Sequence, residues 1–280
     1  MKKHPNDKDA FLWNFFYAET LFYSEQYMLA YEQYRTVREM DLRSKEFADI
    51  QETSAFNAVK ALELIIKDRV AQGEIPGKVL PDGGGQQGGE EVADASATTD
   101  GEQEANTEVA AIKAEPLPEL VRKYVTELDR YVVLRLKNEQ DPLLDSKFAF
   151  QAAKIFYDFN DYPEARRRFE WIIKTYPDKD VGAYAASLTL ETYRVEKDYD
   201  KLAEKANEFA SMLKGEQVAT IKAEIEDYEM ASLFKKAEKA FAEKRYQDAV
   251  DGYLELMSRD EQGEYTTLAL INNPTGGEGQ

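Results

Sequence analysis

The sequence contains no cysteine and a single histidine, His4, and it has no long apolar run. Without cysteine there can be no disulfide, no thiolate metal site and no thiol nucleophile. One histidine in a polar N-terminal segment cannot complete a Ser-His-Asp triad. No stretch approaches the roughly 20 apolar residues that span a bilayer, and the residues after Lys2 and Lys3 are too polar for a signal peptide. We therefore expect no enzyme activity, no cofactor, no metal site and no membrane span.

Basic residues are few compared with acidic ones. The 280 residues include 54 Asp and Glu against 36 Lys and Arg, so the formal net charge is −18. A field of this sign repels the phosphates of nucleic acids and opposes binding to anionic lipid surfaces. We therefore expect a protein or peptide partner of basic or amphipathic character, and no nucleic acid.

A pattern of helix pairs recurs along the chain. Four segments begin with a tyrosine and continue with apolar residues or their replacements at spacings of three, four and three, which form one stripe on a helix. They begin at Tyr27, Tyr162, Tyr199 and Tyr246. A short polar breaker precedes each tyrosine, and another amphipathic helix precedes each breaker. The sequence therefore predicts two antiparallel helices joined by a tight turn in each copy.

Small residues indicate where the helices of a pair approach each other. An alanine in the first helix stands twelve positions before an alanine in the second helix in three copies, as Ala18 and Ala30, Ala153 and Ala165, and Ala237 and Ala249. Close approach needs small side chains, so we expect these alanines to face each other. The third copy has Leu190 and Leu202 instead, which predicts a wider spacing or a shifted register.

This pattern resembles the tetratricopeptide repeat (TPR) family, whose unit of about 34 residues is a helix–turn–helix. The best match runs from Ser146 to Pro177, whereas Leu42 and Glu261 replace the closing proline in two other copies. The resemblance implies an all-α fold, a right-handed superhelical stack of antiparallel helix pairs known as an α-solenoid. In its acidic insertion and its absence of cysteine, the chain is also similar to envelope-associated bacterial repeat proteins of outer-membrane assembly and of myxobacterial gliding. The bacterial periplasm or envelope and the cytoplasm both stay open as locations.

The expected organisation has four segments. TPR-like helices over 8–72 precede a disordered acidic insertion over 73–116, helices over 117–273 continue the same array, and a flexible tail covers 274–280. The insertion contributes −8 of the net charge and has no aromatic residue, so it cannot bury enough apolar surface to offset its ordering entropy. Its glycines lack the Gly-Lys-Ser/Thr ending of a phosphate loop. Long helices are expected at about 44–71, 117–136 and 218–244. A last half-repeat at 265–273 suggests a piece of a longer array.

In the TPR family the first helices of the pairs line the concave face and bind the partner. Carried over to this sequence, the resemblance assigns partner binding to Phe15, Glu19, Phe22, Phe150, Lys154, Tyr157, Glu191, Arg194, Phe234, Glu238 and Phe241. Some family members clamp terminal carboxylates with Lys, Asn and Arg at these positions. Here Phe and Glu predominate, so an apolar or amphipathic segment with basic flanks is the expected ligand. The competing interpretation is that the phenylalanines pack against neighbouring helices.

The leading hypothesis for function is a non-catalytic scaffold or adaptor that binds a polypeptide segment within a multiprotein assembly. Two alternatives stay open at this point. One is a chaperone or secretion adaptor that binds peptides transiently, and the other is the interaction subunit of an enzyme whose catalytic domain lies outside this chain.

Overall fold

The computed structural model describes residues 8–40, 48–80, 113–138, 142–215 and 218–259, together with Thr267. Within these ranges the regular structure consists of ten α-helices and one 3-10 turn, without any strand. The elements are α1 (Lys8–Tyr23), α2 (Tyr27–Glu39), α3 (Ala48–Ala71), η2 (Gly77–Val79), α4 (Glu119–Asn138), α5 (Pro142–Asp158), α6 (Tyr162–Thr175), α7 (Asp180–Val195), α8 (Tyr199–Met212), α9 (Val218–Ala242) and α10 (Tyr246–Arg259). The predicted all-α fold is confirmed, and the hand of the superhelix stays a prediction.

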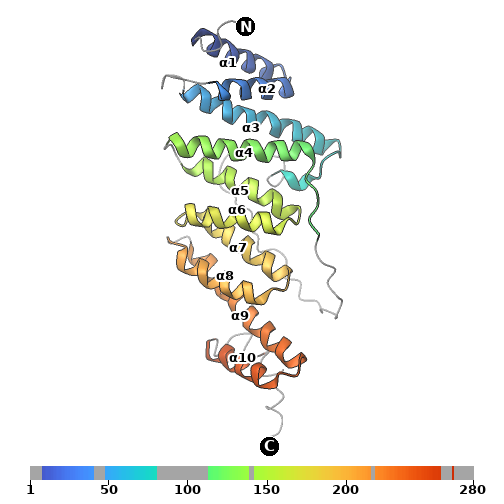
Figure 1. Cartoon of the computed structure of the whole chain (residues 1–280), viewed down its shortest axis with the longest axis vertical. Coiled ribbons are helices and arrows are strands. Elements are labelled where there is room, and N and C mark those ends of the chain that lie inside the picture. The colour runs from blue at the N-terminus through green and yellow to red at the C-terminus, as the bar shows by residue number, and fades with distance from the viewer. Residues whose placement is uncertain are drawn as a thin grey trace, which may run out of the picture. The chain divides into compact units, whose positions relative to one another are not determined.

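The chain divides into two compact units, Met1–Ala165 and Arg166–Gln280. In the first unit α1 packs on α2, α2 on α3, α3 on α4 and α4 on α5, so that neighbours in sequence are neighbours in space (Figure 1). In the second unit α7 packs on α8, α8 on α9 and α9 on α10, and α7 also contacts α9. Each unit is therefore a series of helices in which consecutive helices pack against each other.

The turns within the pairs share one backbone conformation. The predicted tyrosines begin α2, α6, α8 and α10, and two positions before each tyrosine stands a residue with a left-handed backbone. These residues are Glu25 (φ 61°), Asn160 (φ 59°), Lys197 (φ 57°) and Lys244 (φ 63°). The amide N–H that follows each of them donates to a carbonyl five residues back, over 2.9 Å in all four cases, as from Gln26 to Leu21. This is the Schellman motif, which ends the first helix and reverses the chain.

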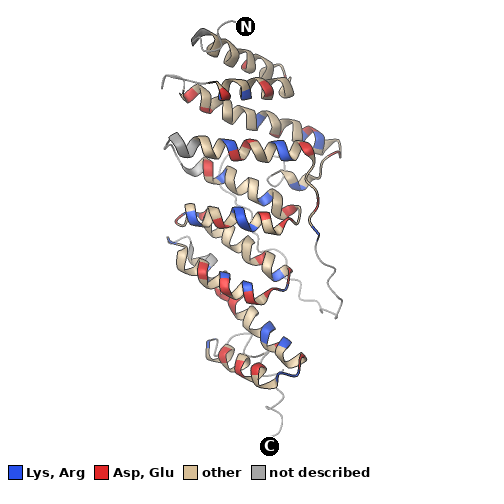
Figure 2. Cartoon of the chain, viewed as in Figure 1, with Lys and Arg blue, Asp and Glu red and all other residues tan. Residues whose placement is uncertain are grey.

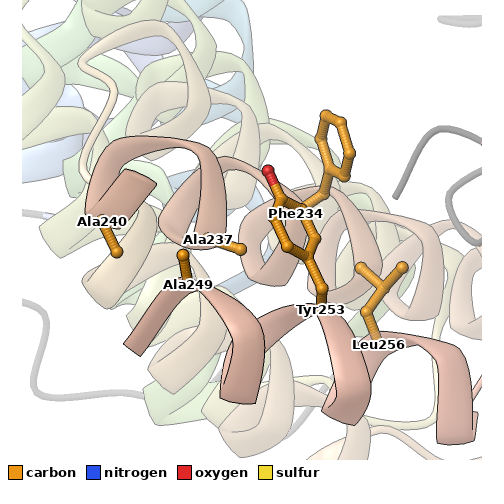
Figure 3. Packing of buried hydrophobic residues seen from close by; sticks show 6 residues of the cluster. All are labelled: Phe234, Ala237, Ala240, Ala249, Tyr253 and Leu256. Atoms are coloured by element: carbon orange, nitrogen blue, oxygen red, sulfur yellow. The ribbon is translucent and has the colours of Figure 1, made fainter. Parts of the chain in front are cut away.

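The alanines predicted to lie between paired helices are buried. Ala18, Ala30, Ala153 and Ala165 are 0% exposed, and Ala237 and Ala249 are each 2% exposed. Figure 3 shows Ala237 and Ala249 between α9 and α10, beside Phe234 and Tyr253. A Cβ added at Gly252 would lie 3.1 Å from the Cβ of Ala237, so the two backbones approach closely here. In the third copy Leu190 and Leu202 are both fully buried.

A buried carboxylate ties α4 to α2. The side chain of Glu127 on α4 is 1% exposed, and it accepts hydrogen bonds from the Arg38 guanidinium and from the Tyr31 hydroxyl on α2. Arg130 adds a third bond, 3.2 Å long. Burial, followed by the charge of Glu127, raises the pKa of Tyr31 to about 12. A carboxylate this deep is tolerated because cations and a hydroxyl compensate it.

The ends of the predicted insertion differ from the sequence-based boundaries. Residues 73–80 and 113–116, which the sequence assigned to the insertion, contact the first unit. Ile75 and Val79 are 7% and 1% exposed, and Lys78 pairs with Glu115 at 2.7 Å. The Glu115 amide donates to the Phe159 carbonyl over 2.8 Å. Three predicted segments lie outside the described residues: the middle of the insertion at 81–112, the half-repeat at 265–273 apart from Thr267, and the tail at 274–280.

The left-handed turns generate a first prediction. Lys244 has a positive φ, whereas Lys239, also exposed, lies within α9. Glycine adopts positive φ without the steric cost of an L-residue, so Lys244→Gly should raise the free energy of unfolding by about 0.5–1 kcal/mol. The matched change Lys239→Gly should lower it by about 1 kcal/mol. Urea denaturation measures both, and an equal loss in the two variants would contradict a left-handed residue at Lys244.

The close approach of α9 and α10 generates a second prediction. Leucine in place of Ala237 would overlap α10, so Ala237→Leu should lower the free energy of unfolding by about 1–3 kcal/mol. Ala242→Leu is the control, because Ala242 ends the same helix and is exposed. Urea denaturation of the two variants compares them directly. Equal stability would mean that the two helices lie further apart at Ala237.

Candidate functional site

On α1 the predicted binding residues Phe15, Glu19 and Phe22 are all partly exposed. Glu19 is held from inside, because its Oε1 accepts hydrogen bonds from Tyr34 Oη on α2 (2.5 Å) and from Asn57 Nδ2 on α3 (2.9 Å). Burial, followed by the hydrogen bond to Glu19, raises the pKa of Tyr34 well above its ordinary value. The rings of Phe15 and Phe22 lie 6.5 and 6.2 Å from the Tyr34 ring. This part of the site is therefore an aromatic cluster above an internal polar network.

On α5 the predicted residues Phe150, Lys154 and Tyr157 are also partly exposed. The Lys154 ammonium pairs with Asp158 Oδ1 at 2.6 Å and lies 5.5 Å from the centroid of the Tyr157 ring. The cation is thus balanced by a carboxylate of its own helix. The pattern is the same as on α1, with aromatic rings beside polar groups that already have partners within the chain.

Helix α3 contributes a charged row that the sequence-based assignment missed. Glu63 accepts from Lys60 at 2.7 Å and from Lys67 at 3.0 Å. Although burial raises the pKa of Glu63, the hydrogen bonds from the two lysines leave it below its ordinary value. The spacings of three and four residues, typical of ion pairs on one helix face, were a usable signal. Asn57 joins this helix to Glu19 of α1.

An aromatic contact joins α3 to α5, where the Phe56 and Phe148 rings stack 6.0 Å apart. The three first helices of this unit are therefore connected by the Glu19–Asn57 hydrogen bond and by this stack. We call a selected set of partly exposed side chains of α1, α3 and α5 the first-helix surface. It consists of Phe15, Glu19, Phe22, Lys60, Glu63, Phe150, Lys154 and Tyr157.

In the second unit the predicted charged residues are engaged with each other. Arg194 donates two hydrogen bonds to Glu191, 2.7 and 2.6 Å long, and Tyr228 Oη donates a third of 3.1 Å. Glu238 pairs with Lys235 at 3.0 Å. The glutamates expected to attract a basic partner thus have partners in their own chain.

The two predicted phenylalanines of α9 differ from each other. Phe241 is 38% exposed, with its ring 5.6 Å from Tyr246. Phe234 is only 6% exposed and packs 6.0 Å from the Tyr253 ring, in the core between α9 and α10 (Figure 3). Phe234 therefore packs against a neighbouring helix, as the competing interpretation predicted, and the prediction that it is an exposed anchor for a partner is wrong.

Sequence reasoning also missed a group of exposed aromatic residues, the largest on any one helix of the described residues. It lies on α1, on a different side of the helix from Phe15 and Phe22, and consists of Trp13, Phe16, Tyr17 and Tyr23. The signal was available in the run Phe11-Leu12-Trp13-Asn14-Phe15-Phe16-Tyr17. Large apolar residues there cover every side of the helix, and one neighbouring helix cannot bury all of them.

Two further properties of the described residues bear on the site. Among them, no group of three or more His, Asp or Glu side chains is placed to hold a metal ion. Within the same residues, none of the helices combines the length and the apolar character needed to cross a bilayer. His4 lies outside the described residues.

No protein-family model matches the sequence, and no curated protein matches it. Among solved structures, the chain is similar to two crystal structures, one of a variant, of the nearly identical TPR-like repeats of a putative kinesin light chain from Podosopora anserina. Identity is 12% and the TM-score is 0.31 in both, and the matches cover 93% and 94% of this chain and 97% and 99% of theirs. A similarity at this level adds nothing to what the turns and helix contacts of the chain establish by themselves.

Proposed function

We propose that this chain is a non-catalytic interaction module that holds a polypeptide segment of a partner on its first-helix surface, as a scaffold or adaptor in a larger assembly. One observation supports this most directly. The surface keeps Phe15 and Phe22 of α1 and Phe150 and Tyr157 of α5 partly exposed, while Glu19 on α1 is hydrogen-bonded within the chain. Partly exposed aromatic rings on a fixed support are the kind of residue that dominates the energy of protein interfaces.

The support lowers the entropic cost of binding. Immobilising a side chain at an interface costs about 0.5–1.5 kcal/mol. Here Tyr34 and Asn57 already fix Glu19, and Phe22 lies edge-on to Tyr27 at 5.5 Å and near Tyr34. A partner segment would therefore meet side chains that are ordered before it arrives.

The charges favour a partner with an apolar face and basic flanks. Since Glu19 and Glu63 have partners within the chain, attraction comes from the whole field of net charge −18 more than from single glutamates. Such a field increases the association rate of basic partners. A bacterial envelope assembly, the setting suggested by the sequence resemblance, belongs to this proposal and rests on that resemblance alone.

Stability measurements distinguish surface residues from core residues. Phe234→Ala should lower the free energy of unfolding by about 3–5 kcal/mol, because it empties a buried site. Phe15→Ala and Phe150→Ala should cost clearly less, because both side chains are partly exposed. Chemical denaturation of the three variants tests this order. A loss at Phe150 as large as the loss at Phe234 would remove Phe150 from the proposed surface.

Binding is tested with a library of fluorescent amphipathic peptides that carry lysine flanks. Fluorescence anisotropy measures the Kd of each peptide that binds. Phe150→Ala should raise this Kd about thirtyfold or more, because the loss of a hot-spot residue costs about 2 kcal/mol of binding free energy. Trp171→Ala is the control, because Trp171 is a 39% exposed aromatic residue on the second helix α6. Added salt should slow association. The proposal fails if no peptide of the library binds, or if Trp171→Ala weakens binding as much.

A further inference from the structure

The outward side of α1 carries a stripe of exposed aromatic residues. Trp13, Phe16, Tyr17 and Tyr23 are 65%, 58%, 51% and 80% exposed. Their spacing places them on one helix face together with the exposed Thr20, which lies between them. We call these five residues the outer stripe. Across the turn, Met28 and Leu29 at the start of α2 are 43% and 55% exposed and add apolar area.

The outer stripe has no charge. From Ala10 to Ser24 the only charged residue is Glu19, and its carboxylate points to Tyr34 and Asn57. Figure 2 shows α1 almost without red or blue, whereas the helices that follow carry both colours. Charged residues make up 32% of the whole chain. Enrichment in Trp, Tyr and Phe with depletion of charge is the composition of an interface core.

The hydroxyls of Thr20 and Ser24 on this face already have partners within α1. Thr20 Oγ1 donates to the Phe16 carbonyl over 2.9 Å, and Ser24 Oγ donates to the Thr20 carbonyl over 2.8 Å. An unpaired buried hydroxyl would cost about 1–3 kcal/mol. Covering Thr20 and Ser24 with another apolar surface therefore does not incur this penalty.

The exposed aromatic area supplies a large part of what a stable association needs. An aromatic side chain contributes about 150–250 Å², so the four partly exposed rings present roughly 500 Å². A standard interface buries about 800 Å² on each partner, which neighbouring side chains such as Met28 and Leu29 help to reach. Apolar patches of this size on a soluble chain are associated with interaction sites.

We propose that the outer stripe is the surface through which two copies of this chain associate about a two-fold axis. Copies of net charge −18 repel each other, and an uncharged face is where they can meet without opposing like charges. A basic partner, the kind that the net charge attracts, finds no acidic side chain on this stripe to pair with. A second copy of this chain therefore fits the outer stripe better than a basic amphipathic peptide does, which is the ligand proposed for the first-helix surface.

The arrangement of side chains also fits a two-fold contact. Thr20 is the small residue of the outer stripe, with Trp13, Phe16 and Tyr17 on one side along the helix and Tyr23 on the other. Two α1 helices that cross at Thr20 place the rings of each copy beside rings of the other. Such a contact is self-complementary and closes at two copies.

Sedimentation velocity of the full chain tests the association. The expected species has twice the chain mass of 32.0 kDa. Phe16→Glu brings two carboxylates into the contact and should raise the dissociation constant about thirtyfold or more. The control Leu254→Glu, at a 57% exposed position on α10, should leave it unchanged. Circular dichroism checks that the variants stay helical, and added salt should strengthen the association by screening like charges.

Two further variants test the symmetry and the contact itself. Thr20→Glu and Thr20→Lys should each dissociate the dimer alone, and an equimolar mixture should restore it, because the crossing places position 20 opposite itself. Trp171→Phe leaves Trp13 as the only tryptophan, since the chain has 2. Its emission maximum should move to shorter wavelength as concentration rises and Trp13 becomes buried.

The proposal is overturned by a wild-type chain that stays monomeric at micromolar concentration, or by an unaffected Phe16→Glu dimer. It is also overturned if Leu254→Glu dissociates the dimer as much as Phe16→Glu does. The same holds if the mixture of the two position-20 variants does not reassociate, or if the Trp13 emission does not change with concentration. A monomeric chain that still binds the amphipathic peptides would reject this inference and leave the proposed function intact, because Phe15 and Phe150 lie outside the outer stripe.

Discussion

The reversal of the chain between two paired helices is the constraint on which the rest of the structure depends. At Glu25, Asn160, Lys197 and Lys244 a left-handed residue ends one helix and allows the next to begin two residues later. So short a connection makes the two helices run antiparallel and close together, and in three of the four pairs buried alanines lie where the helices approach, with Gly252 beside Ala237 in the last pair. Once this geometry is set, it decides which sides of each helix are covered and which remain exposed.

The sequence predicted these features because they are local. A tyrosine after a polar breaker and two alanines twelve residues apart lie within one helix pair, so their spacing indicates both the turn and the contact. The partners of Glu19 could not be predicted in this way, since Asn57 lies 38 residues away on another helix. Phe234 occupies the same stripe position as Phe15, but it is buried against Tyr253 of α10. The burial of Ile75 and Val79 could not be predicted either, because the sequence around them is rich in glycine and continues into an acidic segment.

Polar contacts between helices that are not consecutive fix the arrangement of the first unit. Glu19 joins α1, α2 and α3, and Glu127 joins α4 to α2. Apolar packing tolerates small shifts, whereas a buried carboxylate must keep its donors and so favours one register. The contacts of Glu19 occupy an acid that the sequence alone suggested for attracting a partner. If this chain attracts a basic partner, the attraction is better described as a property of its whole field than of individual glutamates.

Helix α1 carries both proposed surfaces because it is apolar on nearly every side. Phe15 and Phe22 rest on Tyr34 within the unit, whereas Trp13 and Phe16 point away from it. If the outer stripes of two copies associate, the dimer offers two first-helix surfaces to one partner. A partner with two suitable segments would then bind its second segment as an intramolecular event, and its apparent affinity would rise without any new contact. Self-association would in this way strengthen the binding proposed for the first-helix surface.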